Sequence, residues 1–451
     1  MNNCGFTAAA LPSICTHIES TNRTHRSYYT DQQLNNFLLK TMDKFLSSIG
    51  IAFNRAEEVM NEKVINRYIN KLTDIRSKDY FKDCSIVVDS AGFQIQQGFL
   101  NKTQIRDFNN LYYDFFLKNY SNLYEKAFVL DIIPGYSFCP YKSWKELEEF
   151  NIKSYDKAIS LPKDILDKMV YIHHFRTPKT YEMYKRLFYD LDYSSKFNNF
   201  AVGGLVKFSS KDTPPCIMYV VPLVDIISKA IDNNKKHLNF HVLGETEWKS
   251  VLTHCFIERH VKELYDIDLK ITFDSSTIFK VLAMGRYTYV MDDQSIFQFS
   301  IRSEHLNNIW RGIGITEDLI YDFINKAIDG FGMQKISKQI DPMYISKDSG
   351  MNGIFYTYGI LQIFKLFSDF QTLCYSIVDQ LYPIYKSGDS LDFSDKLSEW
   401  MAKLNNGKDT KSLRERVSNL TRSFDILCNL DKEYTTYLIN RYAGGQEYKG
   451  L

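Results

Sequence analysis

The chain lacks the long apolar runs and targeting signals that would place it in or across a membrane. One of its longest apolar stretches, residues 216–227, is interrupted by Pro222 and Asp225 and is shorter than the roughly 18 residues that a membrane-spanning helix needs. The first residues, Met-Asn-Asn-Cys-Gly, show no charged segment followed by an apolar one, so we expect no secretory signal. These absences predict a cytoplasmic protein with no membrane partner.

An excess of charge of either sign is also absent. The 55 Lys and Arg residues oppose 54 Asp and Glu residues, which gives a formal net charge of +1. A balanced chain has no global attraction to nucleic acid, so any contact with DNA or RNA must depend on a local basic patch. Net charge therefore neither supports nor excludes a nucleic-acid partner.

Clustered cysteines are missing as well. The eight cysteines are scattered, and the closest two are Cys4 and Cys15, which indicates reduced thiols rather than a disulfide framework or a Cys-x-x-Cys metal site. The spacing of His254 and His260 is not a usual ligand spacing, and single histidines on helical faces are mostly structural. We therefore expect no metal, no zinc and no required cofactor. The other histidines and the cysteine considered for a zinc site are His237, His241 and Cys255.

What the chain does have is a core and a repeated pattern. At 451 residues, 44% hydrophobic and 15% aromatic, it can bury a sizeable interior. Short β-branched or aromatic segments alternate with segments long enough for helices, which predicts parallel strands with right-handed crossovers. No Gly-x-Gly-x-x-Gly follows the first strand, so we predict an α/β fold of the (β/α)8 TIM-barrel type rather than a Rossmann sheet. The expected strands are 6–15, 49–53, 85–89, 127–131, 169–173, 200–204, 239–244 and 270–274.

The alternation stops near residue 295. Helix-spaced apolar residues occupy 319–328, 360–381 and 413–427. We therefore predict two domains, a catalytic barrel over residues 1–295 and a mostly helical C-terminal appendage over residues 296–451, the latter a candidate nucleic-acid-binding region.

Several predicted strands end in residues that do chemistry or approach ligands. Asp89, Asp131 and Asp274 each close a near-apolar strand, His173 with His174 closes a fourth, and Gly203 with Gly204 a fifth. In a barrel all these ends lie on the carboxyl-terminal face, where barrel enzymes place their sites. Any single Asp there is also explained as a cap of the following helix.

Four short motifs follow one another along the chain. They are Asp-Ser-Ala-Gly-Phe-Gln at 89–94, Phe-Ala-Val-Gly-Gly-Leu at 200–205, His-Val-Leu-Gly at 241–244 and Thr-Phe-Asp at 272–274. In this order they resemble Asp-Ser-Gly-Gly-Phe-Gln, Tyr-Ala-Val-Gly-Gly-Leu, Tyr-Leu-Met-Gly and Met-Phe-Asp of the tRNA-guanine transglycosylase superfamily, with one Gly of the first motif replaced by Ala. Members of that superfamily are (β/α)8 barrels.

The resemblance implies a base exchange by double displacement. Asp274 falls on the nucleophile that forms a covalent glycosyl intermediate, Asp89 on the general acid/base, and Asp131 on the carboxylate that reads guanine. Phe93 is expected in the core, the alternative being a stacking lid. Ser90 and Gln94 line the pocket or stabilise a turn, and His173 contacts the base or packs structurally. The remaining implied base-binding residues are Gly203, Gly244 and, through backbone N–H groups, Gly204 and Leu205.

The departures from the tRNA enzymes point to another substrate. Their nucleophile is followed by Pro-Thr-Arg and they carry a cysteine zinc site, whereas here Ser275 follows Asp274, the next arginine is Arg286, and no cysteine cluster exists. This pattern resembles the DpdA-type DNA-guanine transglycosylases of phages and bacteria, which exchange guanine for 7-deazaguanines such as preQ0. The expected partners are DNA and a free 7-deazaguanine base, in the host cytoplasm if a phage encodes the chain. A homodimer is one expected arrangement.

Three other readings stay open. The chain could act on tRNA with new recognition elements, it could be a non-catalytic nucleic-acid-binding subunit, or it could be a barrel hydrolase of another kind. Retention of both Asp89 and Asp274 argues against a non-catalytic subunit.

Basic residues beyond the barrel are the candidates for nucleic-acid contact. Residues 396–422 hold seven basic and three acidic residues, although a solvated helix face is the favoured explanation of such a run. The candidates are Arg286, Arg302, Arg311, Lys411, Arg414 and Arg416.

Overall fold

The fold is described from a computed structural model. The described residues are 6–9, 44–53, 59–78, 81, 83–132, 139–174, 178–203, 215–244, 248–275, 288–292, 295–299, 354–404 and 411–430.

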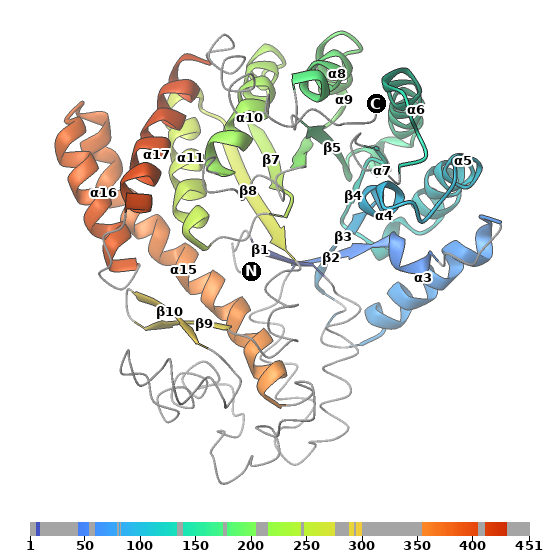
Figure 1. Ribbon diagram of the computed structural model, residues 1–451, viewed down its shortest axis with the longest axis horizontal. Coiled ribbons are helices and arrows are strands. Elements are labelled where there is room, and N and C mark those ends of the chain that lie inside the picture. Colours follow the sequence, from blue (N-terminus) through green and yellow to red (C-terminus); the bar gives the residue numbers. More distant parts are fainter. Residues whose placement is uncertain are drawn as a thin grey trace.

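A curled, all-parallel sheet forms the centre of the molecule (Figure 1). Its strands pair in the order of the sequence, and the last strand pairs with the first, so that Thr7 lies beside Asp274 and the ladder closes on itself. The α/β class and the barrel-like parallel sheet predicted from the sequence are confirmed. The strands are β1 (Phe6–Ala9), β2 (Lys44–Ser48), β3 (Ser85–Asp89), β4 (Lys126–Phe128), β5 (Met169–His174), β6 (Asn199–Gly203), β7 (His237–Val242) and β8 (Asp268–Ser275).

Helices cover the outside of this sheet, and one or more follow each strand from β2 to β7 (Figure 1). The connection between β1 and β2 lies outside the described residues. The helices are α3 (Glu62–Arg76), α4 (Gly92–Gln96), α5 (Lys102–Asn110), α6 (Trp144–Ile159), α7 (Lys163–Leu166), α8 (Pro178–Tyr189), α9 (Tyr193–Lys196), α10 (Pro215–Asp232) and α11 (Trp248–Tyr265), with the π-helix η2 (Leu111–Leu117) and the 3-10 turns η1 (Ile49–Ala52) and η3 (Ser121–Leu123).

One predicted strand is wrong. Residues 49–53 were expected to be extended, but Ile49–Ala52 form the 3-10 turn η1, and the strand is the preceding segment, Lys44–Ser48. The side chain of Ser48 accepts a hydrogen bond from the backbone N–H of Gly50 at 3.2 Å, which caps the turn. Local capping by a serine therefore outweighs the β-branched composition of the segment that follows it.

The sheet buries side chains on both faces. The inner face carries a small apolar layer, and the outer face packs against the helices in a much larger core. Alternate residues of one strand supply the two layers, as Val87 does for the inner layer and Val88 for the outer one on β3. The inner apolar layer consists of Leu46, Val87, Phe128, Val170, Ile172 and Ala201.

The C-terminal helices pack against the outside of the sheet's helices. Helix α15 (Ile354–Lys386) packs on α11 and also contacts β1, while α17 (Lys411–Asn429) packs on α10 and α11, and α16 (Ser390–Leu404) joins them (Figure 1). The carboxylate of Glu258 on α11 links these layers, because it accepts hydrogen bonds from the Ile271 N–H of β8 at 2.6 Å and from the Tyr375 hydroxyl of α15 at 2.5 Å.

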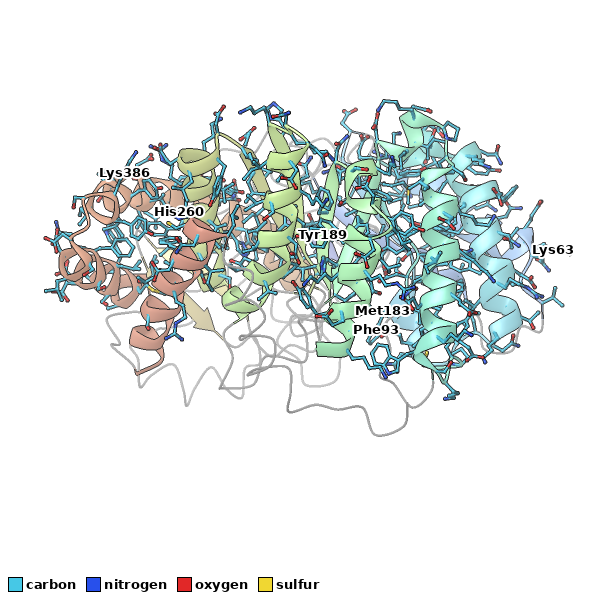
Figure 2. All side chains as sticks on the ribbon, turned by 90° about the horizontal axis from the view of Figure 1, so that it is seen from above. Lys63, Phe93, Met183, Tyr189, His260 and Lys386 are labelled. Atoms are coloured by element: carbon cyan, nitrogen blue, oxygen red, sulfur yellow. The ribbon has the colours of Figure 1, made fainter. Side chains whose placement is uncertain are left out.

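His260 of α11 extends this junction between α11 and the C-terminal helices (Figure 2). Its Nδ1 lies 3.1 Å from the Tyr382 hydroxyl of α15, and its Nε2 lies 3.2 Å from Cys428 Sγ of α17. The hydrophobic core runs without a break from the sheet into this region.

The domain boundary expected at residues 295/296 falls at the start of β10 (Ser295–Phe299). This strand pairs with β9 (Thr288–Asp292) as an antiparallel hairpin that the sequence pattern did not suggest. None of the helices in the described ranges combines the length and the apolarity that a membrane crossing requires.

Candidate functional site

Three carboxylates gather at the carboxyl-terminal end of the sheet. Asp89 is the last residue of β3, Asp131 lies three residues beyond β4, and Asp274 is the penultimate residue of β8. Asp131 and Asp274 are almost fully buried, and the charges of both act on Asp89. The structure thus brings together the three Asp residues that the sequence singled out.

Asp89 holds its proton more tightly than an ordinary aspartate. Burial raises its pKa to about 6, and the neighbouring charges of Asp274 and Asp131 add to the effect. Hydrogen bonds from the Ser48 side chain and from the Ala91 N–H, the latter at 3.3 Å, oppose the rise. A carboxyl group with this pKa exchanges protons near neutral pH, as a general acid or base must.

Asp274 is held through one of its two oxygens. His241 Nε2 and the backbone N–H of Gly244 both lie 3.1 Å from Asp274 Oδ1. Gly244 has a φ of +77°, a conformation that favours glycine, so the turn after β7 can direct its N–H at the carboxylate. Among the residues that the structure describes, none donates a hydrogen bond to Oδ2.

His241 is oriented in turn by Thr272, its register partner on β8. Its Nδ1 lies 2.8 Å from the Thr272 hydroxyl. If Nε2 carries the proton that is donated to Asp274, Nδ1 accepts from the threonine, and both ring nitrogens are satisfied. Thr272 and Asp274 are two residues apart on one strand, so they share its inner face.

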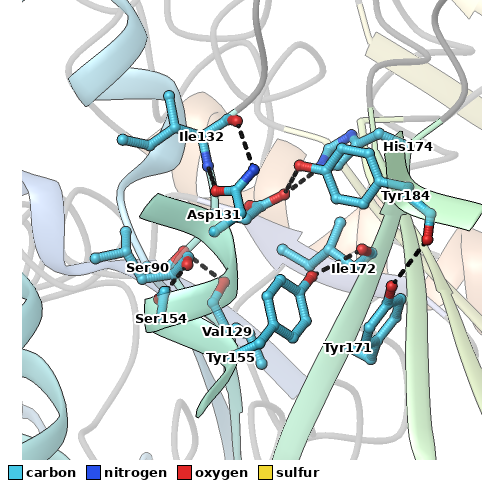
Figure 3. Close-up of polar contacts among 12 residues, drawn as sticks. Ser90, Val129, Asp131, Ile132, Ser154, Tyr155, Tyr171, Ile172, His174 and Tyr184 are labelled. Atoms are coloured by element: carbon cyan, nitrogen blue, oxygen red, sulfur yellow. Dashed lines mark hydrogen bonds and ion pairs between the residues drawn. The ribbon is translucent and has the colours of Figure 1, made fainter. Parts of the chain in front are cut away.

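Asp131 is fixed from the other side of the site (Figure 3). Its Oδ2 accepts a hydrogen bond from the Tyr184 hydroxyl at 2.6 Å and lies 2.7 Å from His174 Nε2, at ion-pair distance. Burial keeps the pKa of Tyr184 well above its usual value, so the hydroxyl stays protonated and donates. The following residue, Ile132, is anchored through its backbone N–H and C=O to the Asn151 side chain at 2.9 and 3.1 Å.

The loop after β3 packs tightly against this group. A Cβ on Gly92 would lie 2.8 Å from the Asp131 carbonyl oxygen, so only glycine fits there. Ala91, which replaces a glycine of the motif, has a φ of 68°, a left-handed conformation that costs a non-glycine residue roughly 1–2 kcal/mol. The Ser90 hydroxyl donates to the Val129 carbonyl at 3.2 Å, which supports the turn-stabilising alternative for Ser90.

Gln94 and Phe93 lie on α4 beside the carboxylates. Gln94 Oε1 is buried and finds no hydrogen-bond donor within the described residues, and the Gln94 side chain packs against Gly50 of η1. Phe93 was expected in the core, but its side chain is 59% exposed and projects from the surface (Figure 2), so that prediction is wrong. The exposed Phe93 ring agrees with the alternative prediction, a lid that stacks on the ligand.

His173 and His174 point to opposite sides of β5. His174 faces Asp131. His173, expected either to contact the base or to pack structurally, lies between β5 and the outer helices, with Nε2 3.6 Å from Asp225 Oδ2 of α10, which agrees with the structural alternative. Hydrogen bonds from Tyr181 and Tyr189 also reach Asp225, and with His173 they hold its pKa below the usual value although burial acts to raise it. The structure does not bring His173 to the carboxylates, because successive strand residues alternate between faces.

Gly203 has a structural reason to be glycine. A Cβ at this position would lie 2.2 Å from His174 Cε1, closer than any real contact. The small residue on β6 therefore makes room for the ring on β5. Gly204 and Leu205 lie outside the described residues.

The predicted nucleic-acid contacts are not among the described side chains. Arg286, Arg302 and Arg311 lie outside the described residues. Lys411, Arg414 and Arg416 belong to the first turns of α17, where the backbone alone is described. Within the described part of the chain, no three His, Cys, Asp or Glu side chains come close enough together to hold a metal ion.

Sequence reasoning missed two residues that orient the carboxylates. His241 was weighed only as a metal ligand, and Tyr184 was not singled out. The alternation of β7 and β8 contained the signal for His241, because His241, Thr272 and Asp274 share the inner face of adjacent strands. No local pattern marks Tyr184, which reaches Asp131 from α8.

Comparison of the chain with protein-family models, with curated proteins and with solved structures found no match in any of the three.

The packing of Gly203 against His174 is testable by a double-mutant cycle. Gly203→Ala should destabilise the protein by about 1–3 kcal/mol, because the new methyl group overlaps the histidine ring. In a His174→Ala background the same substitution should cost little, since the ring is gone. Urea unfolding of the four proteins measures this coupling, and equal costs in both backgrounds would contradict the proposed contact.

The raised pKa of Asp89 predicts a pH-dependent stability difference. A carboxyl group whose pKa is higher in the folded state favours folding when protonated, so its contribution is lost as pH rises from about 4 towards 6. Asp89→Asn, which stays neutral, should therefore be more stable than the parent by on the order of 2 kcal/mol at pH 7.5, with a smaller difference at pH 4. Urea unfolding at both pH values measures it, with Asp107→Asn on the surface of α5 as control.

Proposed function

We propose that the chain is a DNA-guanine transglycosylase of the tRNA-guanine transglycosylase superfamily, built on a (β/α)8 TIM barrel. The observation that carries the proposal is the arrangement of three neighbouring carboxylates that differ in their hydrogen-bond partners and in their pKa. Asp274 is held by Oδ1 while no described residue donates to Oδ2, Asp89 has a pKa of about 6, and Asp131 is fixed by Tyr184 and His174. The motif resemblance supplies the substrate class, and the geometry supports a role for each carboxylate.

Asp274 is the nucleophile in this proposal. Its Oδ2, the oxygen not held by His241 and Gly244, attacks C1′ of the target deoxyguanosine. The C1′–O bond forms as the C1′–N9 bond breaks, and the bonding electron pair leaves with guanine. His241 and the Gly244 N–H hold Oδ1, so the carboxylate presents its second oxygen in one orientation.

Asp89 moves the protons. In its neutral form it donates a proton to the departing guanine, and the carboxylate formed then takes the N9 proton of the incoming 7-deazaguanine. The deprotonated base attacks C1′ and releases Asp274, so configuration is retained over two displacements and Asp89 returns to its starting form.

Asp131 and Gln94 recognise the base. Guanine presents the N1–H and the exocyclic amine as neighbouring donors, whereas adenine presents a different pattern. Because the Tyr184 hydroxyl donates to Asp131 Oδ2 and His174 Nε2 lies 2.7 Å from the same oxygen, Asp131 Oδ1 is the acceptor left for the base. The motif resemblance adds Gln94 as a second contact to the base.

The choice of DNA over tRNA rests on sequence features that are missing, the Pro-Thr-Arg segment after the nucleophile and the cysteine zinc site. The direct test is incorporation of radiolabelled guanine into double-stranded DNA, single-stranded DNA and bulk tRNA. We expect label in DNA. Asp274→Asn should abolish incorporation, and Asp114→Asn, an exposed aspartate paired with Lys118 and Lys157, should leave it unchanged.

Each outcome of this test has a distinct meaning. Label in tRNA alone would transfer the proposal to a tRNA enzyme. Label in DNA that survives Asp274→Asn would remove Asp274 as nucleophile. Label in none of the three acceptors, whether guanine or a 7-deazaguanine is the labelled base, would favour the non-catalytic reading.

His241 is a positioning residue for the same reaction. His241→Phe keeps a ring against Phe128 but loses the bond to Asp274, and we expect kcat to fall about 100-fold with KM little changed. His241→Gln, whose amide N–H can replace Nε2–H, should restore most of the rate. A purely structural role predicts instead that both variants lose activity in proportion to lost stability, which thermal unfolding measures in parallel.

A further inference from the structure

The two carboxylate oxygens of Asp131 have different surroundings (Figure 3). Oδ2 accepts a hydrogen bond from the Tyr184 hydroxyl at 2.6 Å and lies 2.7 Å from His174 Nε2. Oδ1 is the oxygen nearer to the loop after β3, because a Cβ on Gly92 would lie 3.7 Å from it. Asp89, the last residue of β3, leads into that loop. The two oxygens are therefore unequal before any ligand binds.

The two groups beside Oδ2 are held in place by packing within the protein. Tyr184 and His174 are buried, and their rings meet edge to face with centroids 4.8 Å apart. The His174 ring also fills the space that Gly203 leaves open. Burial holds the pKa of Tyr184 well above its usual value, so its hydroxyl keeps the proton that it donates. Oδ2 thus keeps both neighbours whether or not a base is bound.

The occupation of Oδ2 changes which bases the site can discriminate. A carboxylate with both oxygens open matches the N1–H and the 2-amino group of guanine with two parallel hydrogen bonds. Such a site rejects a base that lacks the amino group by a factor on the order of 10⁴, because a buried oxygen is left unpaired. Here Tyr184 and His174 already lie against that oxygen. A missing amino group therefore leaves neither oxygen of Asp131 without a partner.

We propose that this site takes 6-oxopurine bases both with and without a 2-amino group, and that Tyr184 sets this breadth as a positioning residue acting through Asp131. Asp131 Oδ1 accepts from the N1–H, which guanine, hypoxanthine and their 7-deaza counterparts share, whereas adenine presents an acceptor at N1. The inference rests on the proposed function, because it takes a purine base as the ligand of Asp131. It extends that function to bases of the hypoxanthine type.

Equilibrium dialysis of the full chain against radiolabelled guanine, hypoxanthine and adenine measures this breadth without any turnover. We expect guanine and hypoxanthine to bind with dissociation constants within about tenfold of each other, and adenine to bind at least about 100-fold more weakly. A preference for guanine over hypoxanthine of more than about 100-fold would overturn the inference. Failure of both bases to bind would overturn it as well.

Tyr184→Phe tests the residue that sets the breadth, because it keeps the ring and removes the hydroxyl that donates to Oδ2. The 2-amino group of guanine can then donate to this oxygen, so the preference for guanine over hypoxanthine should rise about tenfold. Tyr193→Phe is the matched control, since it removes an equivalent hydrogen bond at 2.6 Å, from α9 to Asp156 of α6. This control should keep the parent's ratio of affinities. A merely structural role would weaken both bases alike, so an unchanged ratio in Tyr184→Phe would contradict the role of Tyr184.

The exchange assay separates this inference from the proposed function. Radiolabelled hypoxanthine should enter DNA at a rate within about tenfold of that of guanine. Binding of both bases without label in any nucleic acid would overturn the transglycosylase proposal and support the base specificity. Incorporation of guanine alone would support the transglycosylase proposal and overturn the base specificity.

Discussion

The alternation of side chains across a closed parallel ladder is the constraint on which the rest of the molecule depends. Each strand directs every second residue inward, and closure of the ladder brings inward residues of distant sequence segments to a common level. On β8 the sequence Lys270, Thr272, Asp274 therefore occupies three successive levels of one interior. A cation lies at one end, a hydroxyl in the middle and a carboxylate at the other end, all from a single pentapeptide.

The interior is divided unevenly between apolar and polar residues. Strands β2 to β6 supply the apolar layer of leucine, valine, isoleucine, alanine and phenylalanine, which excludes water from the middle of the sheet. Strands β7 and β8 instead place His241 and Thr272 at that depth. These polar side chains can be buried in an apolar layer because both ring nitrogens of His241 and the hydroxyl of Thr272 have hydrogen-bond partners. Apolar side chains therefore separate the two ends of the sheet along β2 to β6, whereas hydrogen bonds through Thr272, His241 and Asp274 connect the middle of the sheet to the carboxylate end along β7 and β8.

Much of this arrangement could be predicted from the sequence, and the failures have physical causes. The predicted strand 85–89 has the same bounds as β3, because an apolar run ends in Asp89 just before a turn. The assignment of 49–53 failed because a serine cap decides the local geometry. The pattern places Asp89, Asp131 and Asp274 at one end, but it does not say which of His173 and His174 faces inward, because that depends on a strand register fixed by tertiary pairing. Tyr184 comes from a helix whose rotation is set by packing alone.

The glycine at position 203 has a consequence for how relatives of this chain vary. In the motif this glycine invites an explanation in terms of a ligand that approaches the backbone, yet the space it leaves is filled by the ring of His174. The two positions therefore share one volume across neighbouring strands. Among related chains we expect them to change together, with a larger residue at one position accompanied by a smaller residue at the other. A relative that keeps the glycine but lacks the histidine would have an open space beside its Asp131 equivalent, and under the proposed function that space would widen the base pocket.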